Sequence, residues 1–391
     1  MKLAIKLAYR NLIGAGLRTW LNVIVLSFSF VVIIWMRGVM LGWDHQAKND
    51  MISFEIGGGQ YWHEQYDPLD PFSLNESNAK VPDEFSELIK SGDLEPILIV
   101  QGTIYPLGRM QSVMVKGINP NQTILKIPTS KLDTVVNAIP AVIGGMTAQS
   151  SKLSIGDYVT LRWRDINGTF DAAELVIVDV FYSNVPSAEA GQIYIDIEKL
   201  REMMIMPESA TIFTFRNSEA DWIEVEGWRQ KSFKELTKQV DNMIKTKTAG
   251  QSVFYFILLL LAMLGIFDTQ VLSIFRRQKE IGTYVALGYT RKQVVGLFTV
   301  EGTMNSILAA IVGAIYGIPF LAWQANHGFT LPIDASQFGM AMSQTLFPVY
   351  SIGLIFTTIL IVMITTAVVS YIPSRKIAKM NPTEALRGKL Q

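Results

Sequence analysis

Four long apolar runs interrupt the mixed pattern of polar and apolar residues along this chain. They are Trp20–Leu41, Ser252–Phe275, Val294–Trp323 and Phe347–Ile372. Each run has the roughly 20 residues that a helix needs to cross about 30 Å of hydrocarbon. A helix buried in a soluble domain rarely stays apolar on all sides over such a length. The pattern predicts four transmembrane helices. The first is too long for a removable signal peptide and is expected to remain as an anchor.

Between the first two runs, strand-like and helix-like segments alternate. Phe85, Leu88 and Ile89 have helical spacing before Gly92, which predicts a short helix. The turn signal "DINGT" separates two alternating segments and predicts a hairpin. The expected strands lie in Met51–Gly57, Ser112–Pro120, Tyr158–Trp163, Ala172–Ser183 and the first half of Gly191–Met204, which ends as a short helix. This mixture predicts an α+β domain.

The segment before the second run predicts a helical stalk. From Ser232 to Lys247 the apolar residues share one helical face; they are Phe233, Leu236, Val240, Met243 and Ile244. No proline or clear helix breaker separates them from the second apolar run. We therefore expect a single helix that leaves the domain and continues through the membrane as far as Leu287.

The distribution of basic residues predicts the orientation. Residues 1–19 carry Lys and Arg but no acid, and basic residues also exceed acidic ones in 276–293 and 373–391. The loop 325–346 has no Lys or Arg. Because basic residues concentrate on the cytoplasmic side, both termini and the segment 276–293 are predicted to be cytoplasmic. The large insertion then lies outside.

The combined prediction is an α-helical membrane protein with four transmembrane helices, one plus three, and a large extracytoplasmic α+β domain inserted between helices 1 and 2. The expected order is a cytoplasmic amphipathic segment (1–19), transmembrane helix 1 (20–42), the extracytoplasmic domain (43–250, with its stalk at 232–250), transmembrane helix 2 (251–275), a cytoplasmic helix (276–293), transmembrane helix 3 (294–324), a short outer loop (325–346), transmembrane helix 4 (347–372) and a cytoplasmic tail (373–391).

Composition narrows the possible functions. The formal net charge of zero conceals an acidic insertion, since 43–250 holds 29 Asp and Glu against 19 Lys and Arg. This argues against nucleic acid as a partner. The chain has no cysteine, so no disulfide braces the insertion, which must fold on its own hydrophobic core.

Catalytic and metal-binding patterns are missing from the sequence. There is no G-x-x-x-x-G-K-[ST], and "GGG" at 57–59 lacks the Lys and the following helix, so we interpret it as a flexible loop. His45, His63 and His327 show no spacing typical of metal ligands. The segment "YWHEQYDPLDPF" is expected to be a surface loop, and no nucleophile and base form a pair. We predict a non-catalytic chain without a cofactor or metal of its own.

Four motifs in order resemble those of the MacB/FtsX-like ABC permeases, also called type VII or mechanotransmission permeases. They are "LAYRNLIGAGLRTWLN", "VIGGMTAQSSKLSIGDYVTL", "RRQKEIGTYVALGYTRKQVVGLFTVEG" and "IPSRKIAKMNPTEALRG". The resemblance covers nearly the whole chain, and its layout is closest to the LolC/LolE and MacB permeases. It departs from the family at Val285, where members usually have a basic residue. The family layout would divide the insertion into a porter-like part (43–130 and 205–231) and a sabre-like part (131–204).

The resemblance implies that the cytoplasmic segment is a coupling helix, which seats in a cleft of a separate ATPase subunit. The residues that this assigns to docking are Arg276, Arg277, Lys279, Glu280, Ile281, Gly282, Tyr284, Leu287 and Gly288. The pattern agrees, because Ile281, Tyr284, Val285 and Leu287 would give an apolar face for a partner groove, ringed by charges. Gly288 is suited to end the helix.

Ionisable and polar residues within the predicted spans form a second candidate site. Asp268 and Glu301 fall at similar depth near the inner ends of spans two and three. Charged groups there usually face protein and find partners. We expect both to face protein and to meet Asn305 or a basic residue at the inner rim; snorkelling to the interface is the alternative. The glycines of "GAIYG" predict close helix packing.

The predicted function is that of a permease subunit in the bacterial inner membrane. The resemblance implies an ATPase dimer that binds ATP and Mg²⁺, a second permease chain, identical or related, and contacts with membrane lipids and with a periplasmic protein or lipoprotein. Lipoprotein release from the inner membrane is the first candidate activity. MacB-like efflux of peptides or small molecules and FtsX-like signalling without cargo are the alternatives. A secondary transporter is the weakest, because no inverted repeat is present.

Overall fold

The computed structural model describes residues 17–134, 137–183, 185–217, 222–330 and 345–375. The chain divides into two compact units. A helical unit contains the described residues of 17–43, 244–330 and 345–375, and a folded domain spans 44–243. Most of the predicted amphipathic segment, the outer loop from 331 to 344 and the tail from 376 lie outside the described residues.

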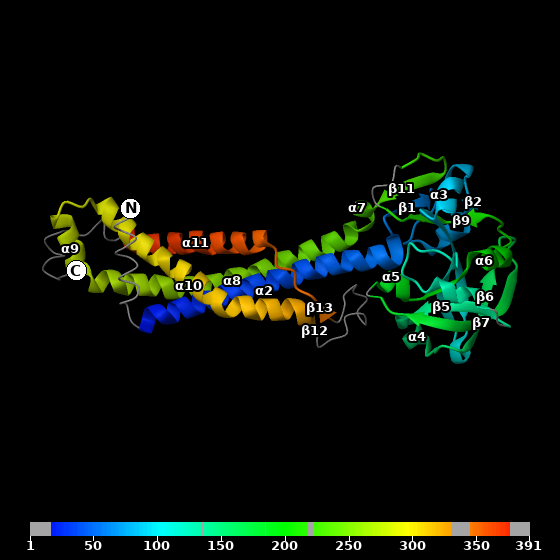
Figure 1. Cartoon of the computed structure of the whole chain (residues 1–391), viewed down its shortest axis with the longest axis horizontal. Coiled ribbons are helices and arrows are strands. Elements are labelled where there is room, and N and C mark those ends of the chain that lie inside the picture. The colour runs from blue at the N-terminus through cyan, green and yellow to red at the C-terminus, as the bar shows by residue number, and fades with distance from the viewer. Residues whose placement is uncertain (1–16, 135–136, 184, 218–221, 331–344, 376–391) are drawn as a thin grey trace. The chain divides into compact units, whose positions relative to one another are not determined.

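The helical unit is built on four long helices that lie side by side (Figure 1). They are α2 (Leu17–Met51), α8 (Lys238–Arg276), α10 (Arg291–His327) and α11 (Ile352–Ser374). Within the described residues these four are long and apolar enough to cross a membrane, which fits the four predicted spans. The fourth helix begins five residues later than predicted because Ser351 caps it, accepting a hydrogen bond from the Leu354 amide at 3.1 Å.

Small residues bring these helices close together. Their shared core consists of Val23, Leu26, Phe30, Ala262, Ile266, Ala309 and Val362. A Cβ atom on Gly317 would lie 2.7 Å from Cγ2 of Val31, and one on Gly313 would lie 3.3 Å from the Ser27 carbonyl oxygen. The close packing predicted from "GAIYG" is therefore confirmed, between α10 and α2.

The domain contains a nine-stranded sheet of order β11-β1-β10-β3-β4-β8-β5-β7-β6. Its strands are β1 (Gly59–His63), β3 (Leu94–Ile104), β4 (Gln111–Ile118), β5 (Ile139–Gly144), β6 (Tyr158–Arg164), β7 (Phe170–Phe181), β8 (Gln192–Asp196), β10 (Ile212–Phe215) and β11 (Trp228–Ser232). The pairs β4–β8 and β5–β7 are parallel and the other pairs are antiparallel. A separate short pair joins β2 (Ala79–Lys80) to β9 (Ser209–Ala210).

Six of these strands close into a barrel. The last strand, β6, also pairs with β3, with Gly102 opposite Trp163 and Ile104 opposite Leu161. Alternate side chains of the six strands fill the interior, as the period of two requires; they include Leu98, Val100, Ile104, Val113, Val115, Ala141, Ile143, Val159, Leu161, Leu175, Ile177, Ile193 and Ile195. The first half of β3 pairs instead with β10 and carries the open part of the sheet.

Short helices cover the sheet. They are α3 (Ser86–Ser91), α4 (Gly145–Ser151), α5 (Pro186–Glu189), α6 (Ile197–Met204) and α7 (Phe233–Leu236). Helix α6 starts where Asp196 accepts a hydrogen bond from the Glu198 amide, and its Leu200 and Met204 close one side of the barrel core. Single-turn or distorted helices complete the domain; these are η1 (Ile52–Ile56), η2 (Pro71–Asn75), η3 (Asp83–Phe85), η4 (Pro106–Gly108) and η5 (Thr129–Asp133).

The local predictions succeed where turn and cap signals are strong. The hairpin around "DINGT", the strand in Ser112–Pro120 and the helix before Gly92 are confirmed, and Gly92 adopts the left-handed conformation of a helix cap. The strand predicted at Met51–Gly57 is wrong, because the chain stays helical through α2 and η1.

Two further expectations need correction. The glycines at 57–59 do not form a flexible loop: Gly58 donates to the Phe215 carbonyl at 2.7 Å, and a Cβ atom on Gly57 would lie 2.4 Å from the same oxygen. The predicted single helix from Ser232 to Leu287 is broken at both ends. Thr237 separates α7 from α8, and α8 ends at Arg276.

Candidate functional site

The first candidate site is the connection between α8 and α10. Helix α9 (Gln278–Ala286) occupies most of it. Arg277 interrupts the helical path with φ −102° and ψ 20°, so that α9 is a separate element from α8 (Figure 1). Gly288 has φ +93°, which favours glycine and ends α9. Thr290 then begins α10 with a capping box to Gln293.

Arg277 ties the three helices together electrostatically. Its Nη1 donates to both carboxylate oxygens of Glu301 on α10, each at 2.8 Å, and its Nε donates to Glu280 on α9 at 2.7 Å. The guanidinium also lies over the Phe298 ring, 4.9 Å from the centroid. The side chains of Arg277 and Glu301 are only 17% and 13% exposed. Charge-assisted bonds in such a shielded place fix the angle at which α9 leaves α8.

The inner face of α9 is hydrophobic and is already covered. Ile281 is 2% exposed and packs with Ile274 of α8 and with Val294, Val295 and Phe298 of α10. Tyr284 and Val285 pack against the same cluster. The expectation that Ile281 presents an apolar face to a partner is therefore wrong, whereas Tyr284 and Val285 are half-buried and their contact with a partner stays a prediction. Helical spacing shows that a face is buried, but not whether the chain itself or a partner buries it.

The outer face of α9 is accessible. Of the predicted docking residues, Arg276, Lys279, Glu280, Leu287 and Gly288 are exposed, whereas Gly282 is buried. Leu287 is 72% exposed, and Thr283 and Ala286 lie on the same open side. This mixed surface of charges, small residues and one leucine can contact a partner. Thr283 and Ala286 were not among the predicted docking residues, because neither residue type signals binding.

The predicted intramembrane residues separate into three environments. Glu301 meets the basic residue Arg277, as described above. Asn305 is 5% exposed. Asp268 lies exposed on α8, and no hydrogen bond or ion pair joins it to another described residue. For Asp268 the expected protein partner is therefore not found among the described residues.

A small polar cluster surrounds Gly302 of α10. A Cβ atom there would lie 2.2 Å from Ser370 Oγ of α11 and 2.7 Å from Gln270 Nε2 of α8. Gln270 Oε1, Asn305 Oδ1 and Ser370 Oγ are buried and have no hydrogen-bond partner among the described residues. The absence of a side chain at Gly302 lets three helices bring polar groups together, and any larger residue would separate them.

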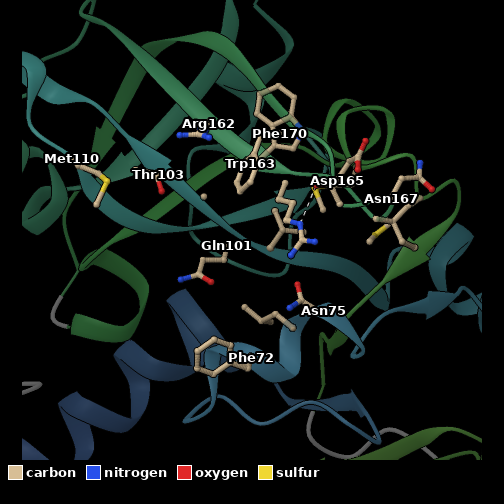
Figure 2. Close-up of a pocket in the computed structure, with 18 of the residues that line it drawn as sticks. Phe72, Asn75, Gln101, Thr103, Met110, Arg162, Trp163, Asp165, Asn167 and Phe170 are labelled. Atoms are coloured by element: carbon tan, nitrogen blue, oxygen red, sulfur yellow. Dashed lines mark hydrogen bonds between the residues drawn. The ribbon is translucent and has the colours of Figure 1, made fainter.

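The folded domain carries a second candidate site, an open cleft of about 680 Å³ (Figure 2). Residues of β3, β6 and η2 line it, with Phe72 on one side and Phe170 on the other in Figure 2. The guanidinium of Arg162 lies 4.4 Å from the centroid of the Phe170 ring. Phe72, Met110 and Phe170 are 81%, 77% and 61% exposed. Large apolar residues exposed beside a cation are typical of a binding surface. Sequence analysis missed this cleft because closure of the barrel creates it.

Comparison with known proteins shows that part of the chain is similar to ABC transporter permeases. The model of the "FtsX-like permease C-terminal" family matches residues 252–382, about a third of the chain. The chain is 22% identical over 259 residues to the "Macrolide export ATP-binding/permease protein MacB" of Burkholderia cenocepacia, covering 64% of this chain and 32% of that protein. It is 29% identical over 154 residues to an uncharacterized ABC transporter permease of Methanocaldococcus jannaschii, covering 39% of this chain and 36% of that protein. The chain thus spans about a third of the length of these relatives.

Proposed function

We propose that the chain is a MacB/FtsX-like ABC transporter permease and that it couples ATP hydrolysis by a separate ATPase subunit to conformational change in its folded domain. The chain itself is non-catalytic, and the partner binds ATP and Mg²⁺. The protein resides in a bacterial inner membrane with both termini in the cytoplasm. The outer face of α9 is then cytoplasmic and is the ATPase-docking surface.

The observation that carries this proposal is the rigid mounting of α9. An ATPase can drive a permease only if the docking element moves together with the spans. Arg277 bonds to residues of both α9 and α10, and Ile281 packs against side chains of α8 and α10. Displacement of α9 by a partner must therefore displace these two helices. Packed elements move as discrete bodies because protein interiors are not continuously deformable.

Helix α8 is the element that can transmit movement of α9 to the folded domain. It runs for 39 residues, from Lys238 to Arg276, and therefore extends about 59 Å at 1.5 Å per residue. Its first residues belong to the folded domain and its remainder to the helical unit. Movement at its α9 end can reach the domain through an unbroken chain of helical hydrogen bonds. Two permease chains, identical or related, would match the two docking clefts of an ATPase dimer.

For the cargo we favour release of lipoproteins from the membrane, with MacB-like export of peptides or small molecules as the alternative. The connection between β6 and β7 is short: Asp165 accepts a hydrogen bond from the Thr169 amide at 2.8 Å and closes the turn. LolC/LolE-type permeases extend a hook at this position to hold a periplasmic chaperone, so this short turn argues against chaperone docking here, although not against lipoprotein release itself. The cleft of Figure 2 favours a second candidate function, signalling to an extracytoplasmic partner, because its exposed aromatic side chains suit protein contact.

The docking surface can be tested with two matched variants. Lys279→Glu combined with Leu287→Asp changes one exposed residue of α9 and the exposed residue that follows it, whereas Lys90→Glu changes an exposed helical lysine of the domain. We expect the α9 variant to lose at least tenfold in recovery of the cognate ATPase by pull-down, and the Lys90 variant to retain it. Equal recovery by both variants would place docking elsewhere.

The cargo is tested on the same proteins. The permease is reconstituted with its ATPase in proteoliposomes, and release of labelled lipoprotein is compared with export of a labelled small molecule. ATP-dependent lipoprotein release that the α9 variant abolishes is the expected result. ATP turnover that depends on α9 without movement of either cargo would favour signalling.

A further inference from the structure

A second cavity of the folded domain is distinct from the cleft in Figure 2. It has a volume of about 440 Å³, within the range of small-molecule pockets. Residues of η1, β1, β3, β4, β8, β10, β11 and α7 are among those that line it. Its walls are mainly aromatic and aliphatic, and include Phe54, Trp62, Tyr66, Ile99, Tyr194 and Ile212. An apolar molecule would fit this cavity.

Lys116 of β4 lies among these apolar walls. In the sheet it lies opposite Ile99 of β3 and Tyr194 of β8. Because side chains alternate along β4, it lies on the outer side of the barrel wall. Its Nζ lies 5.6 Å from the centroid of the Tyr194 ring. No ion pair or hydrogen bond joins Lys116 to any other described residue. Burial lowers the pKa of this lysine, and Glu55 opposes that shift.

The other charged groups of the cavity are engaged. Glu55 accepts a hydrogen bond from Ser187 Oγ at 2.6 Å, and Lys231 forms an ion pair with Glu235. Lys116 is therefore the cation of this cavity that forms no ion pair with a described residue, and the carboxylate of Glu55 acts on it only from beyond ion-pair distance. Tyr66 also lines the cavity, and its hydroxyl has no hydrogen-bond partner among the described residues.

We propose that this cavity binds an apolar molecule carrying one anionic group, with Lys116 as the cation that receives the anion and Tyr66 as a hydrogen-bond donor to it. The apolar part lies against Trp62, Ile99 and Tyr194. An ammonium ion surrounded by aromatic and aliphatic groups is costly without a counter-ion, and a bound carboxylate, sulfonate or phosphate supplies one. The site is separate from the docking surface on α9 and does not depend on it.

The test compares octanoate with octanol, which have the same chain length and differ in charge. Each is titrated calorimetrically into the full chain in lipid nanodiscs, with empty nanodiscs as the reference. We expect octanoate to bind at least tenfold more tightly than octanol. Lys116→Met should abolish that difference, Lys116→Arg should preserve most of it, and Lys90→Met at an exposed site should leave it unchanged. Equal affinities of octanoate and octanol for the unaltered protein would overturn the proposal.

A chemical measurement keeps the proposal testable if Lys116→Met fails to fold. Acetylation of individual lysines by acetic anhydride is followed by mass spectrometry on the unaltered chain across pH. The titratable groups that line the cavity with Lys116 are Glu55, Tyr66, Tyr194, Lys231 and Glu235. We expect octanoate to protect Lys116 at least fivefold and octanol to leave it reactive, while Lys90 responds to neither. Protection by both compounds would show that the cavity binds apolar molecules regardless of their charge, and would overturn the role of Lys116. Protection by neither compound would show that octanoate does not bind in this cavity, and would overturn the proposal.

Discussion

Charge is handled differently in the α8–α10 connection and in the folded domain. In the connection, Arg277 bonds to two carboxylates and stacks on an aromatic ring. In the domain, Glu95 is buried and Lys116 is half-buried beside apolar side chains, and neither forms an ion pair with a described residue. The connection is electrostatically complete within one chain and suits a rigid joint. The domain contains charged groups that have no ion-pair partner among the described residues. Such groups suit a part of the molecule that responds to a bound ion or to a change of pH.

The largest expected effect follows from breaking the joint. Arg277→Leu removes the guanidinium that donates to both oxygens of Glu301, and breaking such a shielded pair costs about 3 kcal/mol. We expect a lower thermal unfolding midpoint of the purified permease and loss of ATPase stimulation by the permease. The double variant Arg277→Met with Glu301→Met should recover most of the thermal stability, because replacing both charges with apolar groups is often neutral. Unchanged stability in the single variant would show that the pair does not hold the joint.

A second effect, of about the same size, concerns Glu95, which is 5% exposed on β3 and accepts a hydrogen bond from the Asn119 amide at 3.2 Å. Burial raises the pKa of Glu95 from 4.5 to about 7. Because the folded state binds the proton more tightly, this group makes the domain less stable as the pH rises from 4.5 through 7. The full change is about 3 kcal/mol, since each pKa unit corresponds to about 1.4 kcal/mol.

Hydrogen exchange of the β3 amides in the full chain measures this change. In the unaltered protein the opening free energy should fall between pH 5 and pH 8. Glu95→Gln keeps an acceptor for Asn119 but cannot ionise, so its opening free energy should be higher than that of the unaltered protein at pH 8. The same slope in both proteins would assign the pH dependence to other groups.

The smallest effect should come from Lys116 in the absence of a ligand. Since burial lowers its pKa in the folded state, the unfolded state binds the proton more tightly, and stability should rise as the pH approaches 10.5. Lys116→Met should stabilise the β4 amides by about 1 kcal/mol at pH 7 and flatten that rise. A destabilised β4 at pH 7, measured by hydrogen exchange, would mean that the described chain already satisfies this charge.

These contrasts also show how far sequence could lead. The four spans were predictable because apolar length is a local property, and the hairpin after Arg164 was predictable because "DINGT" is a turn signal. Barrel closure was not, since it depends on pairing between Gly102 and Trp163, which are distant in the chain. Strand β3 was missed altogether. Its first half is buried in a run without alternation and includes Glu95 and Pro96, residues that are uncommon in strands.

The candidate sites were predictable to different degrees. The motif located α9 correctly, but spacing could not reveal that Ile281 faces inward or that Arg277 binds Glu301. Lys116 looked like an ordinary polar position in an alternating strand, because nothing local indicates that the cavity walls come from many elements distant in the chain. Sequence located the proposed docking surface on α9 more readily than the cavity that contains Lys116.

Strand β3 pairs with strands of both the open sheet and the barrel, and this has a practical consequence for building chimaeras of this protein with its relatives. One half of the strand belongs to the open sheet and the other half to the barrel, so the two parts share a single stretch of backbone. Exchanging residues 131–204 alone would transplant β5, β6, β7 and β8 while leaving behind β3 and β4, the strands on which they close. A transplant that includes everything from Leu94 to Met204 would carry the complete ring. Recombination breakpoints are thus safest before Leu94 and after Met204.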